Sequence, residues 1–454
     1  MLPSREDILR PWTLGGAAVA SSGAIGAAST ASPLPALGLS GLAGFAWLAT
    51  APLYVALGGF LAVRAVSDEF AARPLVAGLN SGALLGLAAI SLAAVRVGTI
   101  KRPRGIVMTL LILGAIAFSA MVGSFVIGYR QGLLEEYIRS ASVVAVGLMA
   151  ANPRGRPSPS KAATALIIAA IVPALSVTIE GLTQWQRVLT EGFRPQGTLS
   201  HPNAAANLFN IMLAVSFWKW MYDGKQTRYL FAAGLMMTTV LMTQSMGGFF
   251  QLVATVTALG LFQFRGVGVR LLAVVAIAGL LAFFVFDPIG LSRADELSSN
   301  DLAAISNDDA QNSLDWRLLN WSRLVEEWRK EPVFGWGLSA TSDYVRPLAG
   351  PRQDGQPHSD VVRLLVEGGV AGFVLVAGVW VVLVLWLFRQ SRANRPNASF
   401  MAATMAILLG VTAHGTATDA TLNTGPMYFV AALIGTALAV GTAGSSTEDP
   451  APPR

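Results

Sequence analysis

Long apolar stretches recur along the chain, and each is about as long as a helix that crosses a membrane. Such a helix needs about 20 mostly apolar residues, because hydrocarbon offers no partner to an unpaired backbone polar group. The pattern therefore predicts an all-α fold, a polytopic membrane helix bundle of about 12 transmembrane helices. The qualifying windows begin near Gly41, Pro74, Gly105, Leu133, Ala162, Pro202, Arg228, Gly247, Arg270, Val361, Ser399 and Gly425.

A polar interval between the ninth and tenth windows is far longer than the other connections. A connection of that length is too long to be a passive turn, so we expect it to carry function. The predicted organisation is a cytoplasmic or interfacial N-terminal segment (1–40), transmembrane helices 1–9 (41–290), a large periplasmic loop (291–357), transmembrane helices 10–12 (358–443) and a disordered cytoplasmic tail (444–454).

Basic residues in alternate short loops predict the orientation, because lysine and arginine are retained on the cytoplasmic side. Five alternate loops are basic, and the loops between them are poorer in lysine and arginine. This alternation places the long loop outside and the C-terminus inside. The segment Trp12–Leu39 is rich in small residues and does not resemble a cleaved signal. With twelve spans both termini lie in the cytoplasm, which requires that this segment does not cross the membrane. The basic loops contain Arg96, Lys101, Arg102 and Arg104; Arg154, Arg156 and Lys161; Lys219, Lys225 and Arg228; Arg265 and Arg270; Arg389, Arg392 and Arg395.

Composition supports a membrane protein and narrows its chemistry. The chain has 454 residues, of which 53% are hydrophobic and only 13% charged, about half the charged fraction of a typical soluble domain. The net charge of +6 is explained by the basic loops, so we expect no nucleic-acid partner. Because the chain contains no cysteine, disulfides and thiolate metal sites are excluded.

The long loop contains a predicted amphipathic helix. Leu314, Leu318, Trp321, Val325 and Trp328 are spaced 4, 3, 4 and 3 residues apart, which puts them on one helix face. Ser313 is suited to cap the start and Pro332 to end it. Arg317 lies at one edge of this stripe and is expected to turn toward the membrane domain, although an interfacial arginine can also simply extend to water.

The stretch that opens the tenth window joins charges to a membrane helix. Asp360, Arg363 and Glu367 are spaced 3 and 4 apart, so they share a helix face that runs about two turns into the membrane. Charges at that depth must pair or line a polar cavity, and these three could pair among themselves. His358 precedes the helix at the outer surface, where an imidazole can exchange a proton near neutral pH or simply cap the helix.

A second outer loop, FRPQGTLSHPNAAANLF (193–209), leads into the seventh span. It contains Arg194, His201 and Asn203, and Pro202 suits the first position of a helix. Asn203 is expected to cap or pack, and His201 can equally be a structural hydrogen-bond partner. His414, near Asp419 at the outer end of the eleventh span, is expected to be buried and to have a packing role.

Three of these stretches resemble the bacterial O-antigen ligases and their relatives, the O-antigen polymerases and O-linked oligosaccharyltransferases. They are GTLSHPNAAANL (197–208), DWRLLNWSRLVEEWRKEPVFGWGLS (315–339) and PHSDVVRLLVEGGVAGF (357–373). Each motif alone is weak, but the ordered set is fairly specific. With the twelve spans and the large loop before the last three, the resemblance covers most of the chain.

The resemblance implies a metal-independent glycosyltransferase of the bacterial inner membrane that uses no cofactor. Such an enzyme passes a glycan from undecaprenyl diphosphate to an acceptor hydroxyl on the periplasmic side. By motif, Arg317 and His358 match the family's arginine and histidine and are the expected catalytic residues. Arg194 lies just upstream of a motif and is a less certain transfer. Arg194, Arg352, His201, Asn203 and Arg363 are the expected substrate-binding residues.

The chain departs from the family pattern at one point. Many members have Ser-Arg-Gly at the end of the eighth span, whereas this chain reads Gln244, Ser245, Met246, Gly247. An arginine that could help to hold the donor is missing, so either Arg194 or Arg352 replaces it or the donor sits differently. Asp308 and Asp309 could contribute to a metal site, but their Ser- and Asn-rich surroundings indicate a solvated turn.

Several interpretations stay open. The acceptor could be the lipid A core, the end of another repeat unit (an O-antigen or exopolysaccharide polymerase) or a protein hydroxyl, because one site can serve several acceptors. A transporter is the alternative from a different class. Transporters place charges and substrate near mid-membrane and contain repeats. No convincing repeat is present, although the deep position of Glu367 keeps this alternative open.

Overall fold

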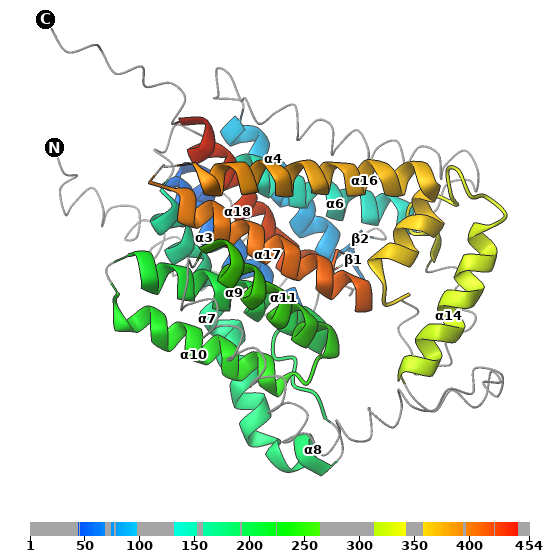
Figure 1. Cartoon of the computed structure of the whole chain (residues 1–454), viewed down its shortest axis with the longest axis horizontal. Helices are drawn as coiled ribbons and strands as arrows, with labels where there is room; N and C mark the ends of the chain where they lie inside the picture. The colour runs from blue at the N-terminus through cyan, green and yellow to red at the C-terminus, as the bar shows by residue number, and fades with distance from the viewer. Residues whose placement is uncertain are drawn as a thin grey trace, which may run out of the picture.

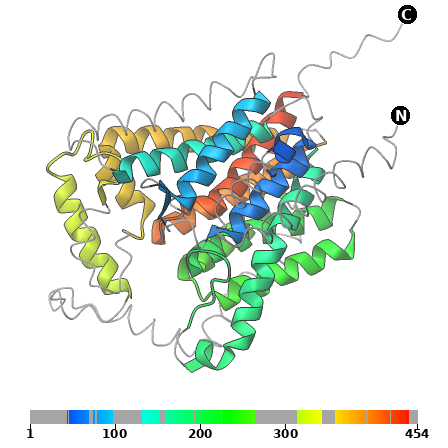
Figure 2. The same ribbon diagram turned by 180° about the vertical axis from the view of Figure 1, so that it is seen from behind.

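The fold is a bundle of membrane helices that lie side by side, with one helix set apart at the end of the bundle (Figures 1 and 2). A computed structural model describes residue 44 and residues 46–68, 74–76, 79–97, 131–151, 158–190, 193–223, 225–263, 313–341, 357–393, 396–421 and 423–443. The helices of the first half are α3 (Leu53–Val66), α4 (Ser81–Val97), α6 (Gln131–Ala150), α7 (Pro159–Thr183), α8 (Trp185–Thr190), α9 (Pro202–Tyr222), α10 (Thr227–Met242) and α11 (Met246–Gln263). The others are α14 (Ser313–Trp328), α16 (Asp360–Arg392), α17 (Ala398–Ala417) and α18 (Thr424–Ala443). Two short antiparallel strands, β1 (Pro74–Val76) and β2 (Leu79–Asn80), precede α4.

Most described helices agree with the predicted spans, but the window near Pro74 opens with β1 and β2, and its helix, α4, begins only at Ser81. The windows beginning near Gly105 and Arg270 lie outside the described residues, and each of the others contains a helix. Four helices are long and apolar enough to cross a membrane by themselves: α7, α16, α17 and the Thr424–Gly441 part of α18. The protein is therefore a helical membrane protein, and the count of twelve spans stays a prediction. The segment Trp12–Leu39 also lies outside the described residues.

Helix starts in the bundle follow local sequence signals. Ser158 caps α7 by accepting a hydrogen bond from the Lys161 backbone N–H at 3.3 Å, and Pro159 takes the first helical position. His201 caps α9 in the same way, because its Nδ1 accepts from the Asn203 N–H at 3.0 Å. This contact matches the expectation that His201 can be a structural hydrogen-bond partner.

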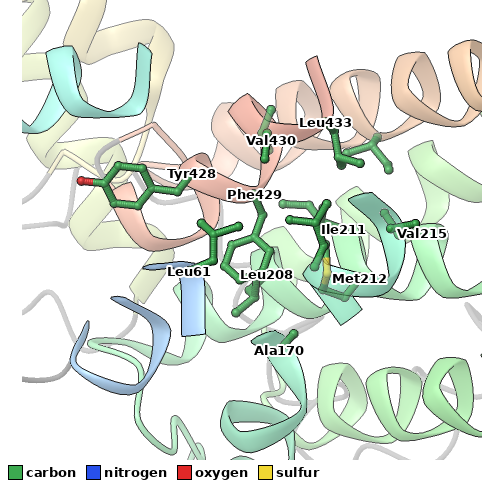
Figure 3. Close-up of a cluster of buried hydrophobic side chains, with 14 of the residues drawn as sticks. Leu61, Ala170, Leu208, Ile211, Met212, Val215, Tyr428, Phe429, Val430 and Leu433 are labelled. Atoms are coloured by element: carbon green, nitrogen blue, oxygen red, sulfur yellow. The ribbon is translucent and has the colours of Figure 1, made fainter. Parts of the chain in front are cut away.

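The core lies where α3, α7, α9 and α18 meet (Figure 3). Leu208, Ile211 and Met212 of α9 are completely buried there, against Phe429 and Leu433 of α18. Small residues bring other helices close together, as is usual in membranes, where helices gain no hydrophobic driving force from one another. A Cβ added to Gly147 of α6, for example, would lie 3.3 Å from the Ala431 carbonyl oxygen of α18.

Polar contacts between helix ends occur at both ends of the bundle. At one end, Lys219 of α9 donates to Ser160 of α7 at 2.7 Å, near the basic loops predicted to be cytoplasmic. At the other end, Ser200 donates to Asp68, which follows α3, at 2.8 Å. Arg194, Arg317 and His358 lie at this second end, which we call the outer end. It includes the loop 193–201, the α10–α11 corner, the start of α16 and the link between α17 and α18.

Candidate active site

The loop 193–201 is fixed to the bundle at both of its sides. The Glu180 carboxylate at the end of α7 accepts from the backbone N–H groups of Gln196 and Gly197 at 3.0 and 2.6 Å. Thr198 donates to the Ala65 carbonyl at 3.1 Å, beside the Ser200–Asp68 contact. The loop therefore holds its side chains in defined positions at the outer end.

Arg194 reaches from this loop to the corner between α10 and α11. Its Nε donates to the Thr243 carbonyl at 3.0 Å and its guanidinium donates to Asn203 Oδ1 at 2.8 Å. The same Asn203 oxygen accepts from the Ser245 hydroxyl at 2.8 Å, and Asn203 is buried. The corner is the one at which the family arginine is missing, and a different part of the chain brings a guanidinium to it.

The predicted loop helix is present as α14, but its buried face differs from the expected one. Leu324 and Asn320 are each 1% exposed, whereas Trp321, Val325 and Trp328 are only half-buried. The inward face is therefore rotated about the helix axis, away from the apolar stripe and toward Arg317. Part of the reason is that the indole of Trp321 bonds the Pro357 carbonyl at 2.6 Å, so its ring serves as a polar tether.

The segment after α14 inserts into a break in α16, and we call this contact the brace. Trp336 and Gly337 donate backbone N–H bonds to the carbonyls of Val366 and Glu367, both at 2.8 Å. In return, Val370 and Ala371 of α16 donate to the carbonyls of Pro332 and Val333 at 2.9 and 3.0 Å. The break is at Gly369, whose φ of 60° and ψ of −168° are not helical. These four bonds replace those that the interrupted helix loses.

Glycine is required on both sides of the brace. Gly369 occupies a backbone region open essentially only to glycine, and an added Cβ would collide with the Val333 carbonyl. A Cβ added to Gly335 would lie 2.5 Å from the Gly369 nitrogen, and Gly335 also has a positive φ of 70°. Thr341 adds a side-chain bond to Glu367 at 2.6 Å. The brace therefore fixes the C-terminal end of α14 to α16.

Replacing Gly369 with alanine is expected to destabilise the protein. The strained backbone alone costs about 1–3 kcal/mol, and the collision with Val333 adds to it. The measurement is the thermal melting temperature of the purified protein in detergent. Gly372→Ala is the matched control, because a Cβ at this position meets nothing within 4 Å. Equal melting temperatures for the two variants would show that the brace does not contribute to stability.

Arg317 and His358 both bond the chain where α17 ends and the link to α18 begins. Arg317 donates to the Ala417 carbonyl at 2.9 Å. Two residues on, Asp419 accepts from the backbone N–H groups of His358 and Ser359 at 2.7 and 3.0 Å. The His358 Nδ1 lies 3.7 Å from the Asp419 carboxylate, and the imidazole is partly exposed, with 15% of its side chain accessible.

Asp419 is a residue of this arrangement that sequence reasoning did not select. It is buried, and its carboxylate lies beside the His358 side chain, a position from which it can orient the imidazole. In the sequence, Asp419 is distinguished only as a carboxylate in an outer loop that contains no lysine or arginine. That signal does not identify its partner, because His358 is 61 residues away in the sequence.

The third histidine, His414, also lies at the outer end. It is completely buried on α17, as expected, and interacts electrostatically with Arg317 and His201. Gly247 of α11 faces it, since a Cβ added to that glycine would lie 3.2 Å from the His414 Nδ1. All three histidines of the chain are thus located at this end of the bundle.

Arg363 lies inside the bundle rather than on a substrate surface. It is 5% exposed and contacts the carboxylates of Glu367 at 3.3 Å, Asp360 at 3.6 Å and Glu136 of α6 at 3.8 Å. It also donates to the Thr421 hydroxyl at 2.5 Å. The pairing interpretation of these helix charges therefore accounts for Arg363, and we omit it from the proposed site.

Two predicted features cannot be placed in this geometry. Arg352 and the pair Asp308 and Asp309 lie outside the described residues. Within the described ranges, no group of three or more histidine and carboxylate side chains has the arrangement of a metal site.

The comparison with known families supports the motif-based expectation. Residues 231–377 match the family model for O-antigen ligase. The match runs from α10 through α14 to the first half of α16, so it contains Arg317, His358 and the brace but not Arg194 or Asp419. No curated protein matches the chain. Residues 231–377, about a third of the chain, are thus similar to the O-antigen ligase family, and this similarity points to glycan transfer or polymerisation in a membrane.

Proposed function

We propose that the protein is a glycosyltransferase that moves a glycan from undecaprenyl diphosphate to an acceptor hydroxyl at the outer face of the bacterial inner membrane. The observation that carries the proposal is that Arg317 bonds Ala417 while the backbone of His358 bonds Asp419, two residues further along the chain. Arg317 is on α14 and His358 just precedes α16, yet the residues that they contact, Ala417 and Asp419, are two positions apart in the chain. A phosphate-binding cation and a proton acceptor are thus available to one substrate.

The proposed reaction forms one bond and breaks another. The acceptor hydroxyl oxygen attacks the anomeric carbon of the first sugar, and the bond from that carbon to the phosphate oxygen breaks. The diphosphate leaves with the electron pair, and Arg317 stabilises the growing negative charge without losing its own proton. His358 accepts the proton of the hydroxyl, while Asp419 holds the imidazole in place. The products are the glycosylated acceptor and undecaprenyl diphosphate.

Arg194 is proposed as the second diphosphate ligand, in place of the family arginine missing at Met246. Its guanidinium bonds the Thr243 carbonyl and Asn203, at the corner where α11 begins. The charge is held in a partly buried position, where it interacts with phosphate more strongly than it would in water. Asn203 and His201 then support this corner, through the bond to Arg194 and the cap of α9 respectively.

A second candidate function is polymerisation, in which the acceptor is the end of another repeat unit rather than the lipid A core. The proposed chemistry is the same for both reactions. A transporter is less well supported, because Glu367, its strongest sequence argument, bonds Thr341 of the brace and Arg363.

The test is a transfer assay with the full chain reconstituted in liposomes. Undecaprenyl-diphosphate-linked glycan is supplied with lipid A core or free glycan as acceptor, and mass spectrometry identifies the product. We expect undecaprenyl diphosphate to be released in step with the new product, at the same rate with and without EDTA. Movement of intact donor across the bilayer without release would support the transporter instead, and loss of activity in EDTA would contradict the metal-free mechanism.

A further inference from the structure

The inward face of α14 has a polar residue beside Arg317. At 100° per residue, Arg317, Asn320, Trp321 and Leu324 all fall within a 100° arc of the helix. Arg317 is near the middle of this arc, where its side chain reaches Ala417. Asn320 lies at the edge of the arc opposite Trp321. The side-chain amide therefore belongs to the face that carries the proposed phosphate ligand.

Asn320 is buried without the partners that an amide normally has. It is 1% exposed, and neither its oxygen nor its nitrogen forms a hydrogen bond among the described residues. A buried polar group without a partner typically costs about 1–3 kcal/mol. An apolar side chain at this position would avoid the cost, as Leu324 does one turn later. An asparagine at this position therefore points to a ligand that supplies the missing bonds.

We propose that Asn320 binds a hydroxyl group of the first sugar of the lipid-linked donor. The inference rests on the proposed function, and it adds a residue that determines sugar binding. An amide offers both a donor and an acceptor, which matches a sugar hydroxyl, whereas a diphosphate oxygen only accepts. Asn320 lies three residues from Arg317, about 4.5 Å along the helix. That offset suits a sugar attached directly to the diphosphate on Arg317.

Contact with the sugar requires α14 to move, because the side chain is covered on its inward face. The brace anchors the C-terminal end of α14 to α16 at Gly369. The N-terminal turns, which carry Arg317 and Asn320, would swing away from the bundle about that anchor to admit the sugar beside Asn320, and Arg317 would then exchange the Ala417 carbonyl for the diphosphate.

The test compares binding of two lipids to the full chain in nanodiscs. One is undecaprenyl diphosphate and the other is undecaprenyl-diphosphate N-acetylglucosamine. We expect Asn320→Leu to bind the bare diphosphate as the wild type does, but to bind the sugar-bearing lipid about 3- to 10-fold more weakly, the effect of one lost neutral hydrogen bond. The matched control is Glu326→Gln on the exposed side of α14, which should leave both affinities unchanged.

Stability distinguishes this role from a structural one. Asn320→Leu replaces an unpaired amide with an apolar group of similar size, so its melting temperature should equal or exceed that of the wild type. A lower melting temperature with unchanged sugar preference would overturn the inference, as would equal weakening for both lipids. If the wild type binds neither lipid better than phosphatidylglycerol, the proposed function itself fails, and the inference fails with it.

Discussion

Replacing Arg317 with alanine is expected to lower kcat/KM for glycan transfer by roughly 10²- to 10³-fold, the usual cost of removing a group that stabilises charge in the transition state. The side chain lies against the Ala417 carbonyl and close to His414, so the variant loses the cation that we place against the leaving diphosphate. The measurement is the initial rate of undecaprenyl diphosphate release at several donor concentrations. Most of the loss should appear in kcat, because the stabilised charge develops during bond cleavage.

Two further variants sharpen this prediction. Arg317→Lys keeps the charge but not the forked geometry, so only part of the activity should return. Arg329→Ala removes an exposed arginine just after the same helix and should change the rate by less than about 2-fold, as expected for a surface charge. If Arg317→Ala and Arg329→Ala lower the rate equally, Arg317 acts only through the general charge of the loop.

Replacing His358 with alanine is expected to lower kcat by roughly 10²- to 10⁴-fold, the typical contribution of a general base. The fold should survive, because the contacts of this residue with Asp419 include a backbone N–H that alanine retains. Circular dichroism and the melting temperature therefore provide the control. The rate is measured with saturating donor, so that the chemical step rather than binding is compared.

A glutamine at this position separates the two possible roles of the imidazole. His358→Gln can orient the acceptor hydroxyl by a hydrogen bond, but it cannot accept a proton under these conditions. We expect it to be nearly as slow as His358→Ala. Recovery to within about 10-fold of the wild type would mean that orientation, not proton transfer, is the contribution of His358.

Local sequence patterns predicted the parts of the fold that depend on local physics. The apolar windows within the described residues contain helices because a membrane helix satisfies its backbone bonds within the segment. The spacing of apolar residues after Ser313 likewise predicted α14. Its buried face was predicted less well, since the brace and the Trp321 tether set the rotation of the helix. Both are contacts with residues distant in the sequence.

In the site, too, local sequence predicted some features, whereas long-range packing set others. Motifs selected Arg317 and His358, but their contacts with Ala417 and Asp419 depend on how α14, α16 and α17 pack. Arg363 was predicted to bind substrate from the resemblance, whereas its spacing from Asp360 and Glu367 already allowed the three charges to pair. Spacing does not reveal that Glu136 of α6 faces the same guanidinium, or that the cluster is buried. Long-range packing thus decided which polar residues are structural.

The central claim is that Arg317 and His358 serve one substrate at the outer end of the bundle. It is tested most directly by a cryo-EM structure of His358→Ala in nanodiscs with an undecaprenyl-diphosphate-linked glycan, since slow transfer leaves the donor intact. The account predicts that the diphosphate lies within roughly 3 Å of the Arg317 guanidinium, with the first sugar beside position 358. A diphosphate bound at the end of the bundle near Lys219, or out of reach of Arg317, would contradict it.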